Sequence, residues 1–493
     1  MGRFKRYDYN QGMFIPVFLE EQLMPGTLEY AIHSLVEKHI DISVFENKYS
    51  NDGTGRLAYD PKVLLKVVLL GYSRGLISSR KIEQACKENI VFMAMSCGQY
   101  PDHSTIAAFV SGMKEEIMPL FRNILLVCEE MNLLGGTFFA LDGCKLPSNA
   151  SKAWSGTVDD LKNKKDKFEE KVRQMIREQE DEDRKGESTD NHDKQIEKLN
   201  RQAERIGKWL NENEPKAGAK RELKSNVTDN ESAKMLTSHG AVQGYNSQVM
   251  VDAKHQVIVH AEVFGNGQDH GHVPPMIDGA RDTMEQLGHS FEGTTLTADC
   301  NYHSNVNIQK CIDEKIDAYI PDLGFRTRDP KFSNRERHGQ KARKCFALED
   351  YQYDKDKDQY ICPNGQTLRM AVKRHVAANT AYRMYRAQDC SSCPMKAKCI
   401  YKNGRGPKTL MVPLGADGIN LSKMMVEKIE SEQGRKIYPQ RIAIVEPVFA
   451  NIRTNKGLDR FTLRGKIKVN IQWLLYCMVH NMEKIANYGF AYC

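Results

Sequence analysis

The chain has 493 residues, of which 40% are hydrophobic and 27% are charged. This length exceeds what one compact core usually holds, so we expect two to four domains in a soluble, mixed globular protein. Lys and Arg exceed Asp and Glu by only +7, which alone identifies no partner. The most apolar run, residues 63–72, is interrupted by Lys66 and is too short to cross a bilayer. The composition therefore excludes a membrane-spanning class.

Cysteine usage indicates the redox compartment. Residues 1–6 lead into no apolar segment, so we expect no secretory signal. Thirteen cysteines, an odd number without an export signal, are typical of reduced cytosolic thiols and not of a disulfide framework. We therefore expect a cytoplasmic protein.

Residues 1–135 are predicted to be entirely helical. Asp60 and Pro61 give an N-cap and a first-turn proline before an apolar stretch. Ser78 or Ser79 can cap a second helix, and residues 101–105 open a third. Short helices joined by tight turns fit either a helix-turn-helix reader of DNA or a helical packing domain, and both readings stay open.

Residues 136–325 alternate between strand and helix patterns, which favours an α/β sheet. Within them, residues 157–234 carry two helical stripes of apolar side chains with a polar link between them. We predict an antiparallel helical hairpin inserted between strands. Residues 244–263 then alternate apolar and polar around a turn, which predicts a β-hairpin.

Three separated acids stand in contexts that suit a catalytic metal. Asp142 and Asp299 each follow an apolar, β-prone run, so we expect both at the C-terminal ends of strands. Glu446 opens an apolar run with helical spacing, with Pro447 where a first-turn proline is tolerated. Hard divalent cations prefer carboxylate oxygens, and two such ions support phosphoryl transfer. Asp252 is a fourth acid, but its place in a hairpin turn favours a structural role. Tyr302 and His303 follow Asp299 and could either contact the scissile phosphate or serve as ordinary loop residues.

Residues 326–434 form a basic, cysteine-rich insert. Four of its cysteines have the spacing C-x27-C-x2-C-x5-C, namely Cys362, Cys390, Cys393 and Cys399. A β-rich insert of this size has little core of its own, so a structural Zn²⁺ held by four thiolates would stabilise it. The alternative is a set of reduced structural thiols.

Residues 435–493 return to helices and are basic. From Arg435 to Lys468 there are nine Lys or Arg residues against two acids. Such a run fits a track for DNA phosphates, although a solvated face has the same composition. The candidate phosphate contacts after the third acid are Arg453, Arg460, Arg464, Lys466 and Lys468.

Taken in order, these motifs resemble a DDE transposase of a bacterial insertion sequence. The resemblance rests on the three acids together with the segments Gly71–Arg80, Pro101–Thr105, Leu141–Gly143, Gly244–Val249, Ala298–Tyr302, Cys390–Cys393 and Val445–Phe449. It implies an RNase H-like catalytic core with an all-helical N-terminal domain, an inserted helical hairpin and a Cys-rich β insert. It further implies that Asp142, Asp299 and Glu446 bind Mg²⁺ or Mn²⁺.

The resemblance also implies partners, and the sequence departs from the family pattern in places. The implied partners are double-stranded DNA, at element ends and target, and a second copy of the chain in a homodimer on DNA. Asn301 and Ala450 stand where many relatives have glycine. Tyr438 and Arg441 lie one position too far upstream of Glu446 for the family's Tyr-Arg-Glu-Lys signature. The DNA contact that the resemblance implies for Arg441 therefore rests on a match shifted by one residue.

Three functions follow as hypotheses. The first is a transposase that cleaves DNA at element ends and joins the 3′-hydroxyl ends to target DNA by a two-metal mechanism. The second is a nuclease or resolvase of the same fold that cuts without joining. The third is a degenerate transposase that only binds DNA.

Overall fold

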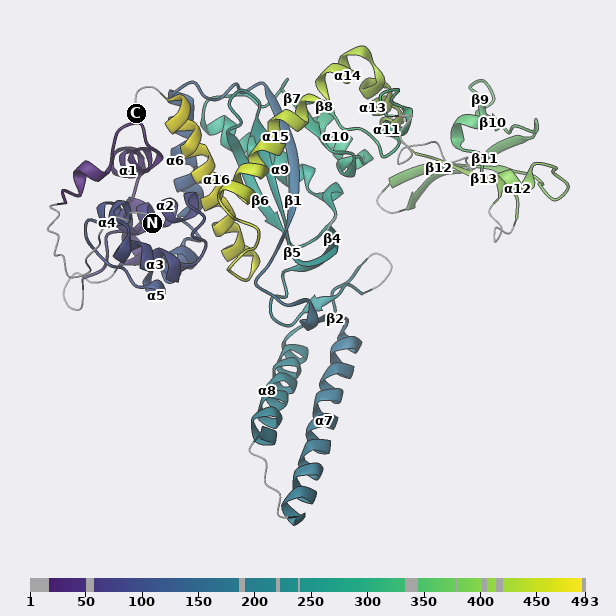
Figure 1. The fold of residues 1–493 in the computed structure, drawn as a ribbon. Helices are drawn as coiled ribbons and strands as arrows, with labels where there is room; N and C mark the ends of the chain where they lie inside the picture. The colour runs from purple at the N-terminus through teal and green to yellow at the C-terminus, as the bar shows by residue number, and fades with distance from the viewer. Residues whose placement is uncertain are drawn as a thin grey trace, which may run out of the picture. The chain divides into compact units, whose positions relative to one another are not determined.

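The computed structural model divides the chain into two compact units (Figure 1). It describes residues 17–49, 57–185, 191–218, 222–237, 240–332, 345–377, 380–400, 406–413 and 420–489. Unit 1 comprises residues 1–133, 452–458 and 474–493, and unit 2 comprises residues 134–451 and 459–473.

Unit 1 is built of helices whose starts are capped locally. The side chains of Asp60 and Ser78 accept backbone N–H groups at the starts of two helices, as the sequence predicts, and Asp102 does so at the start of a third. The end of helix α16 completes this unit, since Tyr476 stacks on Tyr72 with ring centroids 4.5 Å apart. The helices of unit 1 are α1 (Leu28–Lys38), α2 (Pro61–Ser73), α3 (Ser79–Glu88), α4 (Ile90–Met95), α5 (His103–Gly112), α6 (Ile117–Glu130) and the later part of α16 (Lys466–Tyr488).

A mixed sheet is the centre of unit 2. Its strands lie in the order β6, β5, β1, β7, β8, and β4 pairs with the first residues of β5. The pairs β1–β7 and β7–β8 are parallel, and the other pairs are antiparallel. The strands are β1 (Phe138–Pro147), β4 (Ala233–Thr237), β5 (Gly240–Asp252), β6 (Ile258–Phe264), β7 (Thr295–Ala298) and β8 (Asp317–Tyr319).

Helices cover this sheet and give unit 2 its mixed α/β character. Helix α9 contacts β5 and β6, α10 contacts β8, and α15 contacts β1 and β5. The helices are α9 (Val273–Gln286), α10 (Asn305–Asp313), α11 (Phe325–Arg328), α13 (Leu421–Glu430), α14 (Glu432–Ile437) and α15 (Gln440–Ala450). No helix in the described ranges is both long and apolar enough to cross a membrane.

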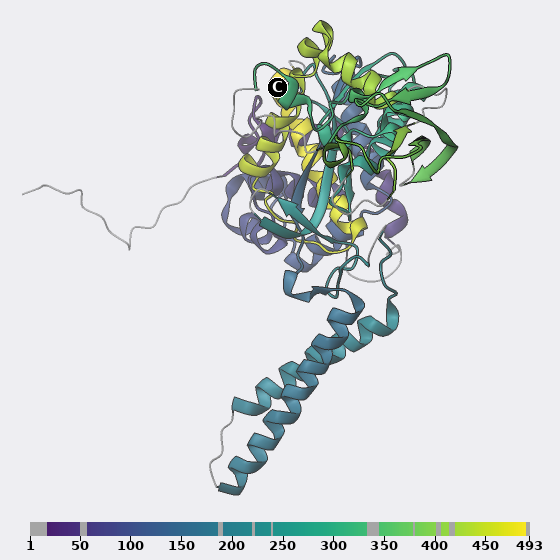
Figure 2. The ribbon, with the colours of Figure 1, turned by 90° about the vertical axis from the view of Figure 1, so that its right-hand side faces the viewer.

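Two long helices run side by side as an arm within unit 2 (Figures 1 and 2). They are α7 (Val158–Lys185) and α8 (Asn191–Glu212), and residues 186–190 of their link lie outside the described residues. Leu161, Ile206 and Trp209 form a buried cluster between them. At the base of the arm, β2 (Ser155–Gly156) pairs with β3 (Ser225–Asn226).

A second, antiparallel sheet holds the cysteine-rich insert. Its order is β13, β12, β11, β10, β9, and a small cluster centred on Tyr351, Leu368 and Tyr385 is its core. The elements are β9 (Gln352–Asp354), β10 (Gln359–Ile361), β11 (Thr367–Ala377), β12 (Thr380–Ala387), α12 (Lys396–Cys399) and β13 (Thr409–Pro413).

Candidate functional site

Asp142 and Asp299 come together through the register of two parallel strands. Leu141 on β1 is paired with Ala298 on β7, so the next residue on each strand is an aspartate. Neighbouring strands lie about 4.8 Å apart. The two carboxylates therefore share one edge of the β1–β7 pair, and the negative charge of each acts on the other.

The predicted position of Asp142 at a strand's end is wrong. β1 continues to Pro147, and Asp142 lies mid-strand opposite Val249 of β5. The β1–β7 pairing ends at Leu141, whereas the β1–β5 pairing continues to Pro147. Asp142 is therefore the first residue of β1 that no longer pairs with β7. Asp299 follows β7 as predicted, and its carboxylate accepts the Cys300 N–H at 2.6 Å.

Asp142 is held in a largely buried setting. Its Oδ2 accepts Arg441 Nη1 at 2.5 Å, and its Oδ1 accepts the Gly143 N–H at 2.8 Å. Burial raises the pKa of Asp142 to about 6, and the charge of Asp299 adds to the rise, although Arg441 and the Gly143 N–H oppose it. The carboxylate is thus charged at neutral pH and becomes protonated below about pH 6.

Glu446 lies on an exposed face of α15, the helix that packs on β1. The prediction that Glu446 and Pro447 open a helix is wrong, since α15 begins at Gln440 and Pro447 lies inside it. Proline cannot donate to the carbonyl four residues earlier, here that of Ala443. Gln256 donates to this carbonyl through Nε2 at 2.9 Å instead, which fastens α15 to the turn between β5 and β6.

A buried polar cluster adjoins the two aspartates, and sequence reasoning missed it. Gln248 Nε2 donates to Asn246 Oδ1 at 2.9 Å and to Asp269 Oδ1 at 3.2 Å. Gln248 Oε1 accepts the hydroxyl of Tyr302, whose pKa is raised by burial and by the charges of Asp142 and Asp269. Polar residues at alternate positions of an otherwise apolar strand were the available signal.

The remaining loop candidates have structural contacts. Asp252 accepts the N–H groups of Gly135, Gly136 and Lys254, so it ties the start of β1 to the turn after β5. This agrees with the structural role predicted for Asp252. The ring of His303 bonds the Ile320 carbonyl and the Ser422 hydroxyl, both at 2.8 Å.

The candidate phosphate contacts differ in their surroundings. Arg441 is buried against Asp142, and Lys466 pairs with Glu262 at 2.8 Å. The other four candidates are exposed side chains, namely Arg453, Arg460, Arg464 and Lys468. Arg460 and Arg464 each donate Nε to a backbone carbonyl, of Ser148 and Asn149 respectively.

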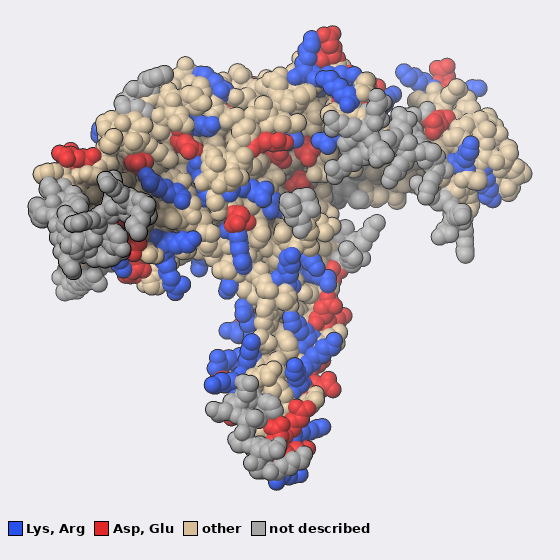
Figure 3. All heavy atoms as spheres, in the orientation of Figure 1, with Lys and Arg blue, Asp and Glu red and all other residues tan. Residues whose placement is uncertain are grey.

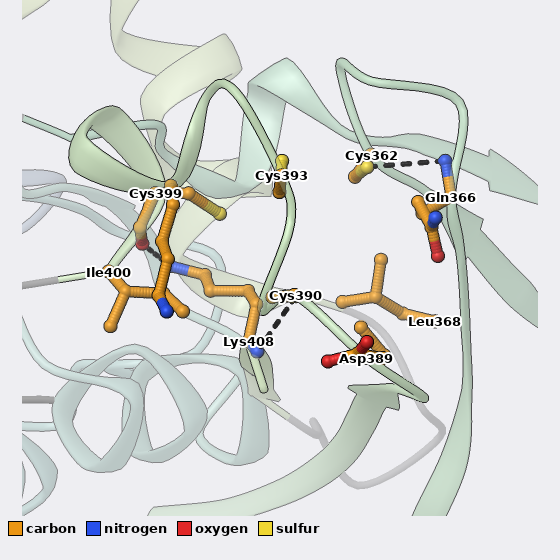
Figure 4. A pocket seen from close by; sticks show the side chains of 11 residues that line it. Cys362, Gln366, Leu368, Asp389, Cys390, Cys393, Cys399, Ile400 and Lys408 are labelled. Carbon is orange, nitrogen blue, oxygen red and sulfur yellow. Dashed lines mark hydrogen bonds between the residues drawn. The ribbon is translucent and has the colours of Figure 1, made fainter. Parts of the chain in front are cut away.

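The four predicted zinc ligands line one small cavity in the second sheet (Figure 4). The cavity has a volume of about 20 Å³, close to the space of one water molecule. Backbone N–H groups of Gln366 and Lys408 point at the sulfurs of Cys362 and Cys390, at 3.3 and 3.5 Å. The Tyr351 hydroxyl lies 3.1 Å from the sulfur of Cys399. Cys393, the remaining predicted ligand, also lines the cavity.

In the part of the chain that the structure describes, no three His, Cys, Asp or Glu side chains stand close enough together to hold a metal as they are. This applies to the three acids and to the four cysteines alike. The fold nevertheless sets Asp142 beside Asp299 and lines one cavity with the four cysteines, whereas Glu446 is an exposed side chain of α15.

Two family models match the chain. A model described as "Transposase DDE domain" matches residues 361–486, and one described as "Transposase domain (DUF772)" matches residues 17–112. The first match contains Glu446 and the four cysteines, and the second lies in the helical unit 1. No match was found among curated proteins or among solved structures.

Proposed function

Because the chain belongs to the DDE transposases of insertion-sequence type, we propose that it cleaves phosphodiester bonds at element ends and joins the 3′-hydroxyl ends to target DNA. The observation that carries this proposal is the register that sets Asp142 beside Asp299. We further propose that unit 2 is an RNase H-like core. The strand order β6, β5, β1, β7, β8, antiparallel on one side of β1 and parallel on the other, supports this assignment.

The donor set fits hard divalent cations. Two adjacent carboxylates with one edge open to solvent are the ligands that Mg²⁺ or Mn²⁺ prefers. Asp142, Asp299 and Glu446 would hold the ions, with Glu446 brought in by a change of its side-chain direction. When bound, such ions activate water and stabilise the leaving oxygen of phosphoryl transfer.

The chain's own residues orient this site. The Arg441 guanidinium balances the charge of Asp142 before any cation is bound, because the two share a buried ion pair. The buried Tyr302 and Gln248 fix the loop after β7 against β5, which holds Asp299 beside Asp142. Since Asp142 is protonated below about pH 6, we expect cleavage to fall as the pH drops through this value.

Single replacements test the acids. Asp142→Ala, Asp299→Ala or Glu446→Ala should abolish cleavage while sparing DNA binding, because each removes a metal ligand and not a phosphate contact. Exposed acids serve as matched controls, with Asp459→Ala for the aspartates and Glu427→Ala for the glutamate. Near-normal cleavage by the Asp299 variant would refute the assignment.

Joining is tested separately from cutting. Pre-cleaved element ends with a 3′-hydroxyl should be joined to target DNA, and ends with a 3′-deoxy terminus should not. Cleavage without joined products would instead indicate the nuclease or resolvase. DNA binding without either reaction would indicate a degenerate transposase.

We also propose that Cys362, Cys390, Cys393 and Cys399 hold a structural Zn²⁺. The four cysteines line one small cavity, and N–H groups directed at sulfur stabilise thiolate charge as outer-shell partners of metal ligands do. The small core of this sheet gives the ion a stabilising role. Protein purified without chelators should carry about one zinc per chain. Cys393→Ser should lose it and Cys97→Ser, at an exposed thiol of unit 1, should not.

A further inference from the structure

Helix α8 carries a basic stripe that the proposed chemistry does not use. Its residues alternate four and three apart, which keeps them within roughly 80° of one helix face. They are Lys194, Lys198, Arg201, Arg205 and Lys208. All five are exposed, and they span about 21 Å along the helix axis. Residues 157–234 lie outside both family matches, so neither match explains the stripe.

The stripe lies opposite the apolar seam of the arm. Ala203 and Ile206 are buried against α7, and the basic residues occupy the other side of α8. Figure 3 shows Lys and Arg gathered over α8 and acidic side chains along the outer edge of α7. The basic residues of α8 thus form one solvent-facing stripe, with the exposed Glu197 beside it and Glu212 just beyond its last residue.

A hollow of about 280 Å³ follows the stripe toward the base of the arm. Its lining consists of Trp154, Lys194, Glu197, Lys198, Arg201, Gln202 and Arg205. The Trp154 ring has Lys164 Nζ 4.9 Å and the Arg205 guanidinium 5.2 Å from its centroid, so two cations contact one aromatic ring. The hollow is thus basic and polar, with a single aromatic wall.

The chain that leads into the base of the arm is hydrogen-bonded to the basic segment near the end of the sequence. Trp154 belongs to the short helix Lys152–Trp154, which follows Ser148 and Asn149 closely. The carbonyls of Ser148 and Asn149 accept Arg460 Nε at 3.2 Å and Arg464 Nε at 2.6 Å. A guanidinium has five N–H donors, so one bond through Nε leaves the terminal nitrogens for a phosphate. All these residues belong to unit 2.

We infer that α8 is a backbone-binding surface for duplex DNA, which the arm guides toward the basic segment carrying Arg460 and Arg464. The inference rests on the proposed transposase function. It adds a DNA-binding surface outside the cleavage site. Duplex DNA carries one negative charge per 1.7 Å of axis, so about 21 Å of stripe faces many phosphates. Arg201 pairs with Glu197 on the exposed surface, and such pairs exchange readily for phosphate.

The observations favour DNA over a second copy of the arm. Protein interfaces are anchored by buried aromatic or aliphatic side chains. Among the described residues of α8, none is an exposed large apolar side chain. Phosphate binding needs cations, and the five Lys and Arg side chains of this face outnumber the acids Glu197 and Glu212 that pair with Arg201 and Lys208.

The test compares two charge-matched variants of the full chain. The stripe variant carries Lys198→Gln, Arg201→Gln and Arg205→Gln. The control variant carries Lys162→Gln, Arg173→Gln and Arg177→Gln, which lie on the flank of α7 that faces away from Lys164. Binding to a 40-base-pair random duplex is measured by fluorescence anisotropy across a KCl series without added Mg²⁺, and circular dichroism checks the helix content of both.

We expect the stripe variant to lower the log–log salt slope by two to three, because each lost phosphate contact lowers it by about one. At 0.1 M KCl this corresponds to a loss of affinity of roughly 60- to 500-fold. The control variant should change the slope by less than one. Random and element-end duplexes should be affected alike, since backbone contacts do not read sequence.

Other outcomes overturn the inference. An unchanged slope in the stripe variant, or equal losses in both variants, would exclude a specific phosphate surface on α8. An unchanged slope with loss of self-association in sedimentation would assign the stripe to a second copy. If the unmodified chain shows no salt-dependent DNA binding, both proposals fail. If it binds DNA but does not cleave, only the cleavage proposal fails, and the slopes still decide on α8.

Discussion

Gly143, next to the first catalytic candidate, offers a quantitative test of how tightly the site is packed. A Cβ added at Gly143 would lie 2.0 Å from Gln248 Nε2 and 2.9 Å from Asn246 Oδ1. The end of a glutamine side chain usually moves aside at little cost. Here it is fully buried and bonded to Asn246, Asp269 and Tyr302, so moving it breaks these bonds.

The expected loss of stability for Gly143→Ala follows from three contributions. Overpacking a buried site costs about 1–3 kcal/mol. Leaving the buried Tyr302 hydroxyl without its acceptor costs about 1–3 kcal/mol. The reduced entropy of the unfolded chain offsets about 0.4–1 kcal/mol. We expect a net loss of about 2–4 kcal/mol in the free energy of unfolding of unit 2.

A double-mutant cycle isolates the contact. In a Gln248→Ala background the added methyl group has room, so Gly143→Ala should be nearly neutral and the coupling energy about 2–4 kcal/mol. Gly271→Ala is the control, because its Cβ would meet no atom within 4 Å, and it should change stability by less than about 0.5 kcal/mol.

Trp473 provides the assay. Its indole N–H donates to the Gln248 carbonyl at 3.1 Å, so its fluorescence reports on this region. Replacing the other two tryptophans, Trp154 and Trp209, by phenylalanine leaves Trp473 as the only tryptophan whose fluorescence is followed in urea denaturation. Equal losses from Gly143→Ala with and without Gln248 would refute the packing argument.

Three further predictions concern buried ionic and polar groups. Burial lowers the pKa of His272 to about 4, below the usual 6.5, so the native state binds fewer protons than the unfolded state between these pH values. The free energy of unfolding should therefore fall by up to about 3 kcal/mol as the pH drops from 6.5 to 4. In denaturation experiments across this range, the free energy of unfolding of His272→Phe should depend less steeply on pH. Glu37→Gln leaves the buried Lys66 ammonium, now 2.8 Å from the Glu37 carboxylate, without its counter-charge, and should destabilise unit 1 by about 3–5 kcal/mol in thermal denaturation, most of it recovered by adding Lys66→Met. Gln256→Ala removes the hydrogen bond to the Ala443 carbonyl. Hydrogen exchange should then show a free energy of opening for the α15 amides that is lower by about 1 kcal/mol. Unchanged protection would mean that α15 does not depend on this bond.

Local signals predicted local structure well. The caps at Asp60 and Ser78 lie where the sequence places them, because an N-cap is satisfied by neighbours two or three residues away, and the third helix begins within residues 101–105 as predicted. The apolar periodicity of 157–234 likewise corresponds to α7 and α8, whose stripes meet each other.

The errors arose where distant partners override local preferences. Asp142-Gly143 has the composition of a turn, yet pairing with β5 keeps these two residues extended. Glycine suits position 143 because the Gln248 side chain occupies the space that a Cβ would need. Pro447 is tolerated inside α15 because Gln256 satisfies the carbonyl that proline cannot. The Asp142–Arg441 ion pair joins residues almost 300 positions apart, for which no spacing rule exists.

The division of the chain into units has a consequence for its synthesis. Unit 1 draws its core from both termini, as the Tyr72–Tyr476 stack and the buried Lys456–Glu483 ion pair illustrate. At a translation rate of about 5–20 residues per second, Tyr476 emerges roughly 20–80 s after Tyr72. Throughout this interval the first helices expose the apolar faces that the C-terminal helix later covers. The nascent chain therefore cannot complete unit 1 until the later part of α16 has been translated, although the first helices of this unit are made first.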